Sequence, residues 1–250
     1  MNFEEFWTRG DVHERVKIAL KEANLLEKKL EIEDLFPLDQ YHARGIAATI
    51  ELADKLNFAK NSTIIDIGCG LGGPARYFSK RFNCNVYGID ITEAFIEIGN
   101  YFNKLTHIDH QVTLLKGDGE NLPYQTEFFD GAVSQHVTMN IENREQFFNE
   151  AFRVLKKGAI FGFSEHGLGT KGSPIFPLPW ADNEDMSFLK TPEYTKSLLK
   201  KIGFKNIKII STGEKYISGY NSLLKKGQSN EKPTLGIHVI GGDSMLERSK

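Results

Sequence analysis

A glycine-rich segment beside an acidic residue has the composition of a nucleotide-like cofactor site. Asp66–Gly73 (DIGCGLGG) follows a β-branched run and precedes Pro74, which can open a helix because its missing N–H would be unpaired there. Gly68 and Gly70 let the backbone turn sharply and let a ligand approach the main chain, while the N–H groups of a helix start can bind an anionic end. The segment therefore predicts a strand, a tight loop and a helix N-terminus around a bound ligand.

The glycines alone leave two cofactor classes open. Gly68, Gly70 and Gly73 also satisfy the dinucleotide pattern G-x-G-x-x-G, and Asp90, at the end of a second predicted strand, suits a ribose in either class. Two further acids favour a ligand with a positive amino group, a ribose and an adenine amine: Asp66 before the glycines, and Asp118 after a third predicted strand. S-adenosylmethionine carries all three groups.

These motifs resemble those of class I S-adenosylmethionine-dependent methyltransferases, from about Asp39 to the C-terminus. Within that superfamily the chain is similar to the ubiquinone/menaquinone and sterol C-methyltransferases, the sarcosine/dimethylglycine and phosphoethanolamine N-methyltransferases, and sugar O-methyltransferases. The resemblance implies S-adenosyl-L-methionine as cofactor, S-adenosyl-L-homocysteine as product and a small-molecule methyl acceptor. It leaves the acceptor atom open among N, O and C, and the composition leans slightly towards a small amine or another polar metabolite.

The strands and helices expected from the sequence alternate as far as residue 164. Strands are predicted at 63–67, 84–90, 112–115, 128–136, 159–164, 207–210 and 235–240, and helices at 11–30, 46–56, 75–81, 94–105, 145–155, 191–202 and 217–226. The alternation predicts an α/β fold with a doubly wound, mostly parallel sheet, helices on both faces and ligands at the carboxyl ends of the strands. The resemblance adds a Rossmann-like sheet of seven strands whose last strand is antiparallel.

Two segments are expected to be appendages of the catalytic domain, which is predicted over 39–250. Residues 1–38 are interpreted as an N-terminal helical lid, with packing against the domain edge or a dimer contact as alternatives. Residues 167–192 contain prolines, glycines and aromatic residues, which is typical of a shaped loop. Because long loops in compact domains tend to be functional, this segment is predicted to be a substrate cap.

Position in the predicted elements assigns a role to each candidate residue. The predicted cofactor-binding residues are Asp66, Gly68, Cys69, Gly70, Gly72, Asp90, Ile91, Asp118, Gly119 and Gln135. The predicted substrate-binding residues are Tyr41, His42, His136, Glu165, His166 and Trp180. His136 is also the candidate catalytic general base, because an unperturbed imidazole titrates near working pH; a structural hydrogen bond is the alternative. No metal site is predicted, because His107–His110 lies in a hydrophilic loop.

Composition limits the partners. A net charge of −2 and an isoelectric point of about 6.4 argue against nucleic acid, and no apolar stretch reaches membrane-spanning length. We therefore expect a cytoplasmic monomer or homodimer that acts on a small-molecule substrate. Two alternatives remain: an NAD(P)-dependent Rossmann oxidoreductase, weakened because no Tyr-x-x-x-Lys grouping is apparent, and a catalytically silent S-adenosylmethionine-binding scaffold.

Overall fold

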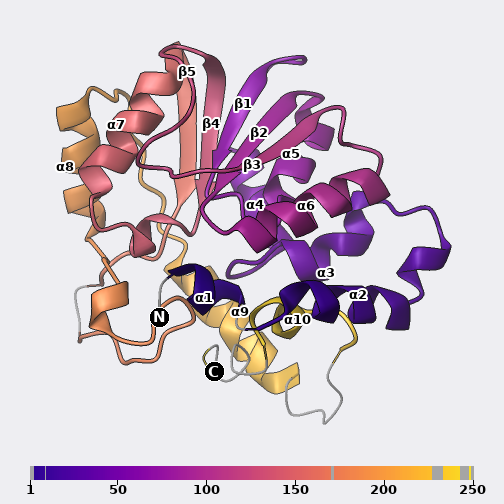
Figure 1. The fold of residues 1–250 in the computed structure, drawn as a ribbon. Helices are drawn as coiled ribbons and strands as arrows, with labels where there is room; N and C mark the ends of the chain where they lie inside the picture. Colours follow the sequence, from indigo (N-terminus) through magenta and orange to yellow (C-terminus); the bar gives the residue numbers. More distant parts are fainter. Residues whose placement is uncertain (1–2, 9, 170–171, 227–232, 243–247, 249–250) are drawn as a thin grey trace.

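Five parallel strands form the centre of the computed structural model, which describes residues 3–8, 10–169, 172–226, 233–242 and 248 (Figure 1). The strands are β1 (Thr63–Ile67), β2 (Asn85–Asp90), β3 (Val112–Lys116), β4 (Phe129–Gln135) and β5 (Leu155–Ser164), in the order β3-β2-β1-β4-β5. The order reverses direction at β1, with β2 on one side and β4 on the other. Ligands bind at such a switch point in open α/β sheets, so the topology places the site at the ends of these three strands.

Helices cover both faces of the sheet. Helices α4 (Ile46–Ala53), α5 (Gly73–Phe82) and α6 (Glu93–Leu105) pack on one face, and α7 (Arg144–Val154) and α8 (Pro192–Ile202) pack on the other (Figure 1). Each face has its own apolar core around the two central strands, since β1 is buried from Ile64 onwards and β4 except at Asp130. The predicted α/β class with a parallel sheet and helices on both faces is confirmed.

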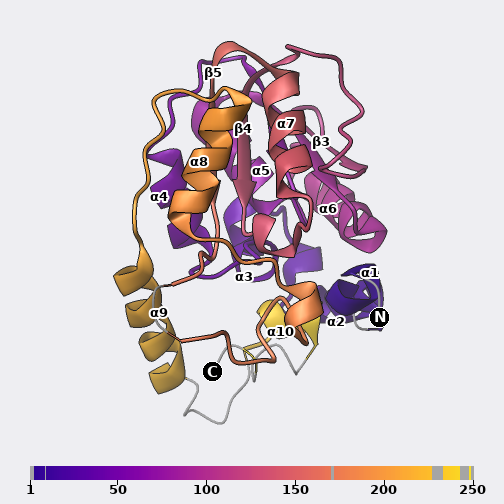
Figure 2. The same cartoon turned by 90° about the vertical axis from the view of Figure 1, so that its left-hand side faces the viewer.

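A third layer lies below the sheet in both views (Figures 1 and 2). It contains α1 (Phe3–Thr8), α2 (Val12–Glu22), α3 (Phe36–Asp39), α9 (Gly213–Lys226) and α10 (Ile237–Gly241). Short 3-10 helices complete the described chain: η1 (Leu25–Glu27), η2 (Ile32–Leu35), η3 (Thr138–Asn140) and η4 (Glu184–Met186). Contacts between Tyr216 of α9 and His136, just past β4, place α9 at the carboxyl ends of the strands.

The last two predicted strands are wrong. Residues 207–210 form no strand: Ile207 packs partly buried against the core, but Ile209 and Ile210 are 49% and 57% exposed. Residues 237–241 form the helix α10, whose Val239 and Ile240 are buried among residues of α2 and α6. Arg15 donates to the carbonyls of both residues, which satisfies the backbone of this short helix. In the described residues the sheet therefore has five strands and no antiparallel member.

Two helix predictions also need correction. The helix predicted over 11–30 ends at Glu22, because Asn24 takes a left-handed conformation at φ 55°, and a 3-10 turn follows. The helix predicted over 46–56 ends at Ala53, and in it Ile50 is 40% exposed whereas Thr49 is fully buried. A polar residue thus occupies the buried side of α4, next to the site.

Candidate active site

The glycine loop joins the ends of β1 and β2. The backbone N–H groups of Gly68 and Cys69 donate to the Ile89 carbonyl at 2.7 and 3.0 Å, and Gly70 N donates to Asp90 Oδ2 at 2.8 Å. Gly68, Gly70 and Gly72 all have positive φ, which favours glycine. A Cβ at Gly68 would lie 2.2 Å from a Val137 methyl, whereas a Cβ at Gly70 would meet nothing within 4 Å. The loop therefore leaves open space at Gly70.

Two carboxylates flank that space. Asp66 is 1% exposed, and its Oδ2 atom has no hydrogen-bond partner. Burial, together with the nearby Asp90, raises the pKa of Asp66 to about 8. Asp90 accepts from Gly70 N and from Thr92 N at 2.9 Å; burial raises its pKa, and these two N–H groups partly counteract that rise. A group with several N–H or O–H donors would satisfy both acids.

The other predicted cofactor residues lie nearby but differ in their surroundings. Ile91 is 53% exposed beside Asp90, and Asp118 is exposed and accepts from Glu120 N at 2.8 Å within its own turn. Gly119 packs so closely on Phe147 that a Cβ would lie 2.9 Å from its ring. Cys69 is 4% exposed, and burial raises the pKa of its thiol well above the ordinary value. This thiol is therefore a packing group.

A buried ion pair between Arg76 and Asp39 stabilises the glycine loop. Arg76 of α5 donates to Asp39 Oδ2 at 2.9 Å, with both side chains at most 1% exposed, and to the Leu71 carbonyl at 2.6 Å. A further bond reaches Asn103 of α6 at 2.7 Å. Gly73 has no room for a Cβ, which would lie 2.3 Å from the Asp39 carbonyl oxygen. Asp39 and Arg76 thus fix the loop against the segment that precedes α4.

Three histidines from distant segments meet at the ends of β4 and β5. The rings of His42 and His136 stack with centroids 5.6 Å apart, and His166 meets His136 edge-on at 4.7 Å. Trp180 of the predicted cap stacks on His166 at 4.4 Å. Tyr216 completes the group, with its hydroxyl 2.5 Å from His136 Nε2. We call these five residues the aromatic cluster.

The histidines of the aromatic cluster are uncharged at neutral pH. Burial lowers the pKa of His42 and of His166 to about 4. Burial also lowers the pKa of His136 well below its ordinary value, and the neighbouring histidines and Arg44 contribute. All three rings therefore offer a hydrogen-bond acceptor as well as a donor.

Thr49 links the aromatic cluster to the cofactor end of the site. Its hydroxyl donates to Gln40 Oε1 at 2.6 Å and lies 3.1 Å from His42 Nε2, while Gln135 Nε2 donates to it at 3.2 Å. The second polar atoms of the two amides, Gln40 Nε2 and Gln135 Oε1, are buried without a partner. One amide donor and one amide acceptor are thus left for a ligand.

Two predicted substrate-binding residues, Glu165 and Tyr41, contact other side chains of the protein. Arg144 donates to Glu165 Oε2 at 2.7 Å and to the Phe188 carbonyl at 3.0 Å, and Thr195 Oγ1 donates to Glu165 Oε1 at 3.1 Å. Hydrogen bonds of the Glu165 carboxylate thus connect the end of β5 to α7 and α8, and Arg144 extends this connection to the end of the cap. Tyr41 packs edge-on against Trp7 and Phe95 at 5.8 and 6.1 Å between ring centroids, where it connects α1 to α6.

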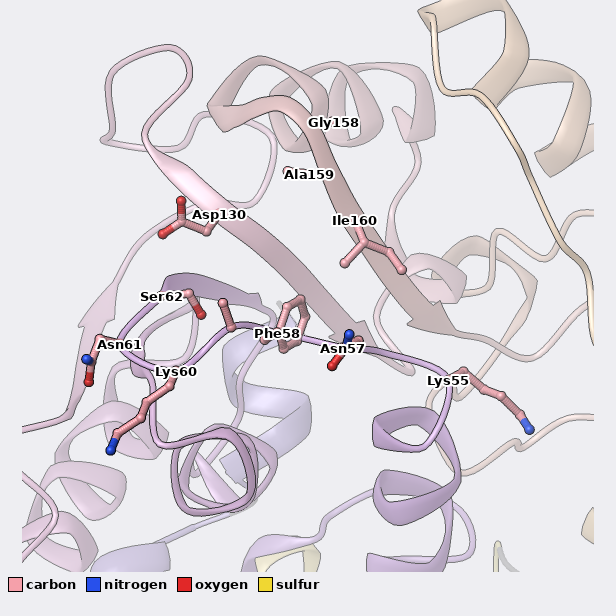
Figure 3. Close-up of a pocket in the computed structure, with 11 residues that line it drawn as sticks. Lys55, Asn57, Phe58, Lys60, Asn61, Ser62, Asp130, Gly158, Ala159 and Ile160 are labelled. Atoms are coloured by element: carbon pink, nitrogen blue, oxygen red, sulfur yellow. The ribbon is translucent and has the colours of Figure 1, made fainter.

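A hollow of about 500 Å³ lies at the opposite ends of the strands (Figure 3). Phe58, Ser62, Asp130 and Ile160 are among its lining residues. In Figure 3 the amino groups of Lys55 and Lys60 point away from each other, so they do not converge on a ligand. In the part of the chain that the structure describes, no group of three or more His, Cys, Asp or Glu side chains has the arrangement of a metal site.

Comparison with known proteins identifies the fold that carries this site. Residues 65–163, from the end of β1 to β5, match the family model described as a methyltransferase domain. Residues 65–163 form a methyltransferase domain. The methyltransferase domain therefore includes the glycine loop, Asp90 and His136, and the predicted family is confirmed.

Relatives and solved structures agree with this assignment. The chain is 33% identical over 114 residues to sterol 24-C-methyltransferase of Candida albicans, covering 46% of this chain and 30% of that protein. It is 28% identical over 175 residues to sarcosine/dimethylglycine N-methyltransferase of Halorhodospira halochloris, covering 70% of this chain and 62% of that protein. Phosphoethanolamine N-methyltransferase 2 of Haemonchus contortus has a TM-score of 0.71 at 18% identity, covering 99% of this chain and 56% of that chain.

The chain spans about a third of the length of the sterol methyltransferases that it matches, so their activity is not transferred whole. The structural neighbour is under a quarter identical and shows the fold alone. Among the helices of the described residues, none is both long and apolar enough to cross a membrane.

Several residues of the site were not predicted from the sequence. Gln40 is adjacent to the predicted Tyr41 and could have been included on that ground. Thr49 had a weaker signal, a polar residue within an otherwise apolar helix, and Tyr216 had none, because it lies 80 positions from its partner His136. Arg144 opens α7 and is 2% exposed, and its position just before the helix predicted over 145–155 did not indicate this burial.

Proposed function

We propose that this chain transfers a methyl group from S-adenosyl-L-methionine to a small-molecule acceptor. The observation that carries the proposal is the open space at Gly70, which is bonded to Asp90 with the unpartnered Asp66 carboxyl nearby, inside a methyltransferase domain. When bound, S-adenosyl-L-methionine supplies the methyl group on a sulfonium carbon. The rest of the task falls to side chains of this protein.

The residues present fit this cofactor. Asp66 Oδ2 and Gln135 Oε1, both buried and without a partner, can accept from its amino group. Gln40 Nε2 can donate to its carboxylate. Each oxygen of Asp90 holds one backbone N–H, which leaves lone pairs for the two ribose hydroxyls. Ile91 and Asp118 are proposed to meet the adenine, where the exposed Ile91 side chain would be covered.

The protein contributes mainly by positioning the acceptor and excluding water. Holding two reactants in line lowers a barrier by up to roughly 7–11 kcal/mol in favourable systems. The cap over 167–192 and the helices of residues 1–38 are proposed to close this site. Trp7 of α1 packs with the cap residues Trp180 and Met186, so the two segments share one apolar cluster below the strand ends. The acceptor would then lie between the cofactor and the aromatic cluster.

The acceptor is proposed to be a small molecule, because the similar sterol and sarcosine/dimethylglycine methyltransferases are named for small-molecule acceptors. His136, at the end of β4 and within the aromatic cluster, is the proposed group that contacts the acceptor, together with His42 and His166. A cytoplasmic location and a monomeric or homodimeric state remain predictions.

Calorimetry on the purified chain tests the cofactor. We expect binding of S-adenosyl-L-methionine and S-adenosyl-L-homocysteine and none of NAD, followed by transfer of labelled methyl from the cofactor to a metabolite extract. Binding of NAD alone would replace the proposal with the oxidoreductase alternative. Cofactor binding without transfer to any metabolite would favour the silent scaffold.

Two glycine variants give this test a matched control. Gly70→Ala and Gly158→Ala both add a methyl at a positive φ, 53° and 82°, where nothing lies within 4 Å. Each change costs backbone strain of roughly 1 kcal/mol, so their melting temperatures should be similar. Only Gly70→Ala fills the proposed cofactor space, and we expect its affinity for S-adenosyl-L-homocysteine to fall at least about tenfold, or about 1.4 kcal/mol. Equal affinities of the two variants would contradict this placement.

A further inference from the structure

The acceptor side of the site lacks the negative charge that the cofactor side has. Burial is the main reason for the low pKa of His42 and of His136, and Arg44 adds to it in both cases. Among the described residues, no carboxylate raises the pKa of His42, His136 or His166. The electrostatic environment of the three rings is therefore neutral to positive.

The nearby carboxylates are already paired. Glu165 follows β5 beside His166, but it is bound by Arg144 at 2.7 Å and by Thr195 at 3.1 Å. Glu51 lies between two cations, Arg44 at 2.8 Å and Lys215 at 2.5 Å. Neither acid is available to balance an ammonium group that would be bound against the histidines.

The aromatic faces are also occupied. Cations bind over the open face of an aromatic ring, with Trp as the strongest partner. Trp180 stacks on His166 with ring planes 14° apart, and the Tyr216 ring already has the Arg44 guanidinium 5.4 Å from its centroid. One face of each ring is thus filled, and Trp180 is only 7% exposed, so the pair offers little open aromatic surface to a cationic acceptor.

His136 instead offers a place for a hydroxyl. The Tyr216 hydroxyl lies 2.5 Å from His136 Nε2, so this nitrogen already has a partner, and with Nε2–H donating to the Tyr216 oxygen the other ring nitrogen is the acceptor. The second ring nitrogen of His136, Nδ1, is buried without a hydrogen-bond partner. The residue is held in this position at φ 56°, directly after β4.

We infer that the methyl acceptor is an uncharged, flat hydroxyl compound of the phenol type, bound through its O–H to His136, and that the methyl group is transferred to oxygen. The inference rests on the proposed function and replaces the slight lean towards an amine. An amine with a pKa near 10 is almost entirely cationic at pH 7 and would meet both Arg44 and the sulfonium without a counter-charge, whereas a phenol enters neutral.

The transfer balances with the groups named. The bond between the methyl carbon and sulfur breaks, and its electron pair stays on sulfur, which becomes neutral. A bond forms between the methyl carbon and the phenol oxygen. The phenol proton passes to Nδ1 of the neutral His136 imidazole, whose Nε2–H is held by the Tyr216 oxygen, and from there to solvent. No oxidant, reductant or further reactant is needed.

Binding of three matched probes to the full chain with S-adenosyl-L-homocysteine tests the inference. Phenol, benzylammonium and benzoate present similar rings with a neutral hydroxyl, a cation and an anion. By NMR titration at pH 7 we expect phenol to bind at least about tenfold more tightly than benzylammonium, because an unpaired buried cation is costly. Equal or weaker binding of phenol overturns the inference, and benzoate binding more tightly than phenol overturns the uncharged class. Failure of S-adenosyl-L-homocysteine itself to bind would instead contradict the proposed function.

Turnover with the cofactor identifies the methylated atom. A panel of phenols and benzylamines with matched substituents should yield anisole products, with kcat/KM about 100-fold higher for phenols than for amines. Preferential N-methylation, or an absence of O-methylated product from every phenol while any amine is methylated, overturns the inference.

Two variants of His136 separate its contact with the acceptor from its packing. His136→Gln retains a hydrogen-bonding side chain, whereas His136→Phe retains the ring and removes both nitrogens. We expect phenol affinity to fall about tenfold in His136→Phe, and less in His136→Gln, with the affinity for S-adenosyl-L-homocysteine within twofold of the parent in both. Unchanged phenol affinity in His136→Phe overturns the proposed contact.

Discussion

The site has two halves at the carboxyl ends of the strands, a cofactor half at β1 and β2 and an acceptor half at β4 and β5, and the two are built in opposite ways. The half at β1 and β2 is nearly continuous in sequence, acidic, and held by backbone hydrogen bonds to Ile89 and Asp90. The half at β4 and β5 brings together rings from positions as distant as His42 and Tyr216, and its histidines are neutral. A methyl donor that carries positive charge needs the first kind of surface, and a neutral acceptor needs the second.

The strongest test of this contrast is to remove an acid from the cofactor half. In Asp90→Ala the acceptors for Gly70 N and Thr92 N are lost together with the proposed ribose contact. We expect the affinity for S-adenosyl-L-homocysteine to fall about 100-fold, or about 2.7 kcal/mol, by calorimetry. Asp118→Ala is the comparison, because its exposed carboxyl is bonded to its own turn and should cost less. A larger loss in Asp118→Ala would place the main cofactor contact at β3.

The second test loosens the acceptor half without touching the cofactor half. The Arg144–Glu165 pair is buried, with side chains 1% and 13% exposed, and Arg144 also holds the Phe188 carbonyl at the end of the cap. Breaking a buried pair costs roughly 3–5 kcal/mol, so Arg144→Met should melt at a lower temperature. We expect acceptor KM to rise about 30-fold, close to 2 kcal/mol, while cofactor affinity stays within twofold.

Glu145→Gln is the matched control for that variant. It breaks an exposed pair on the same helix, with Lys201 at 2.7 Å and side chains 47% and 67% exposed. Surface pairs contribute about 0–1 kcal/mol, so both KM and melting temperature should be close to the parent values. If Arg144→Met reduced cofactor affinity as much as acceptor affinity, the two halves would not be separable.

The third test uses the pH dependence of the cofactor half. Because the pKa of Asp66 is raised to about 8, its carboxyl is protonated at pH 6 in the ligand-free protein. A cationic amino group favours the carboxylate, so binding must release this proton below pH 8. The affinity for S-adenosyl-L-homocysteine should therefore rise between pH 6 and pH 8, by at most about tenfold per pH unit. Asp66→Asn should flatten the profile, and a parent affinity that falls over this range would contradict the assignment.

The smallest effect concerns the thiol inside the glycine loop. Cys69 and Cys84 are 4% and 1% exposed, and burial raises the pKa of both thiols. The thiolate is the reactive form, so a disulfide reagent at pH 7 should label neither cysteine in the folded protein and both after unfolding. Rapid labelling of Cys69 in the native state would show that the loop is open to solvent.

The cofactor half could be predicted from sequence because its information is local. The Asp66–Gly73 segment, the spacing to Asp90 and the proline that opens α5 are short-range features, and they appear in the structure as a strand, a loop and a helix. Likewise the first five strands and the helices α5 to α8 follow from alternation and from flanking glycines such as Gly203, which ends α8.

Four of the five residues of the aromatic cluster were predicted from sequence, but their mutual contacts and the C-terminal elements were not, because long-range contacts decide them. The apolar run at 235–240 fits a strand by composition, but Arg15 and the residues of α2 bind it as a helix. Glu165 was expected to contact substrate, and the structure shows its carboxylate bound to Arg144, whose role no local pattern indicates. Tyr216 reaches His136 only because α9 lies below the strand ends.

The buried pair of Asp39 and Arg76 bears on attempts to transplant this domain. The segment 65–163 that matches the methyltransferase family begins 26 residues after Asp39, yet the Arg76 guanidinium beneath its glycine loop depends on that carboxylate. A chimaera that moved 65–163 alone would bury an unpaired arginine under the cofactor loop, which is strongly destabilising. A portable version of the domain must therefore start before α3, at a point that the family boundary does not mark.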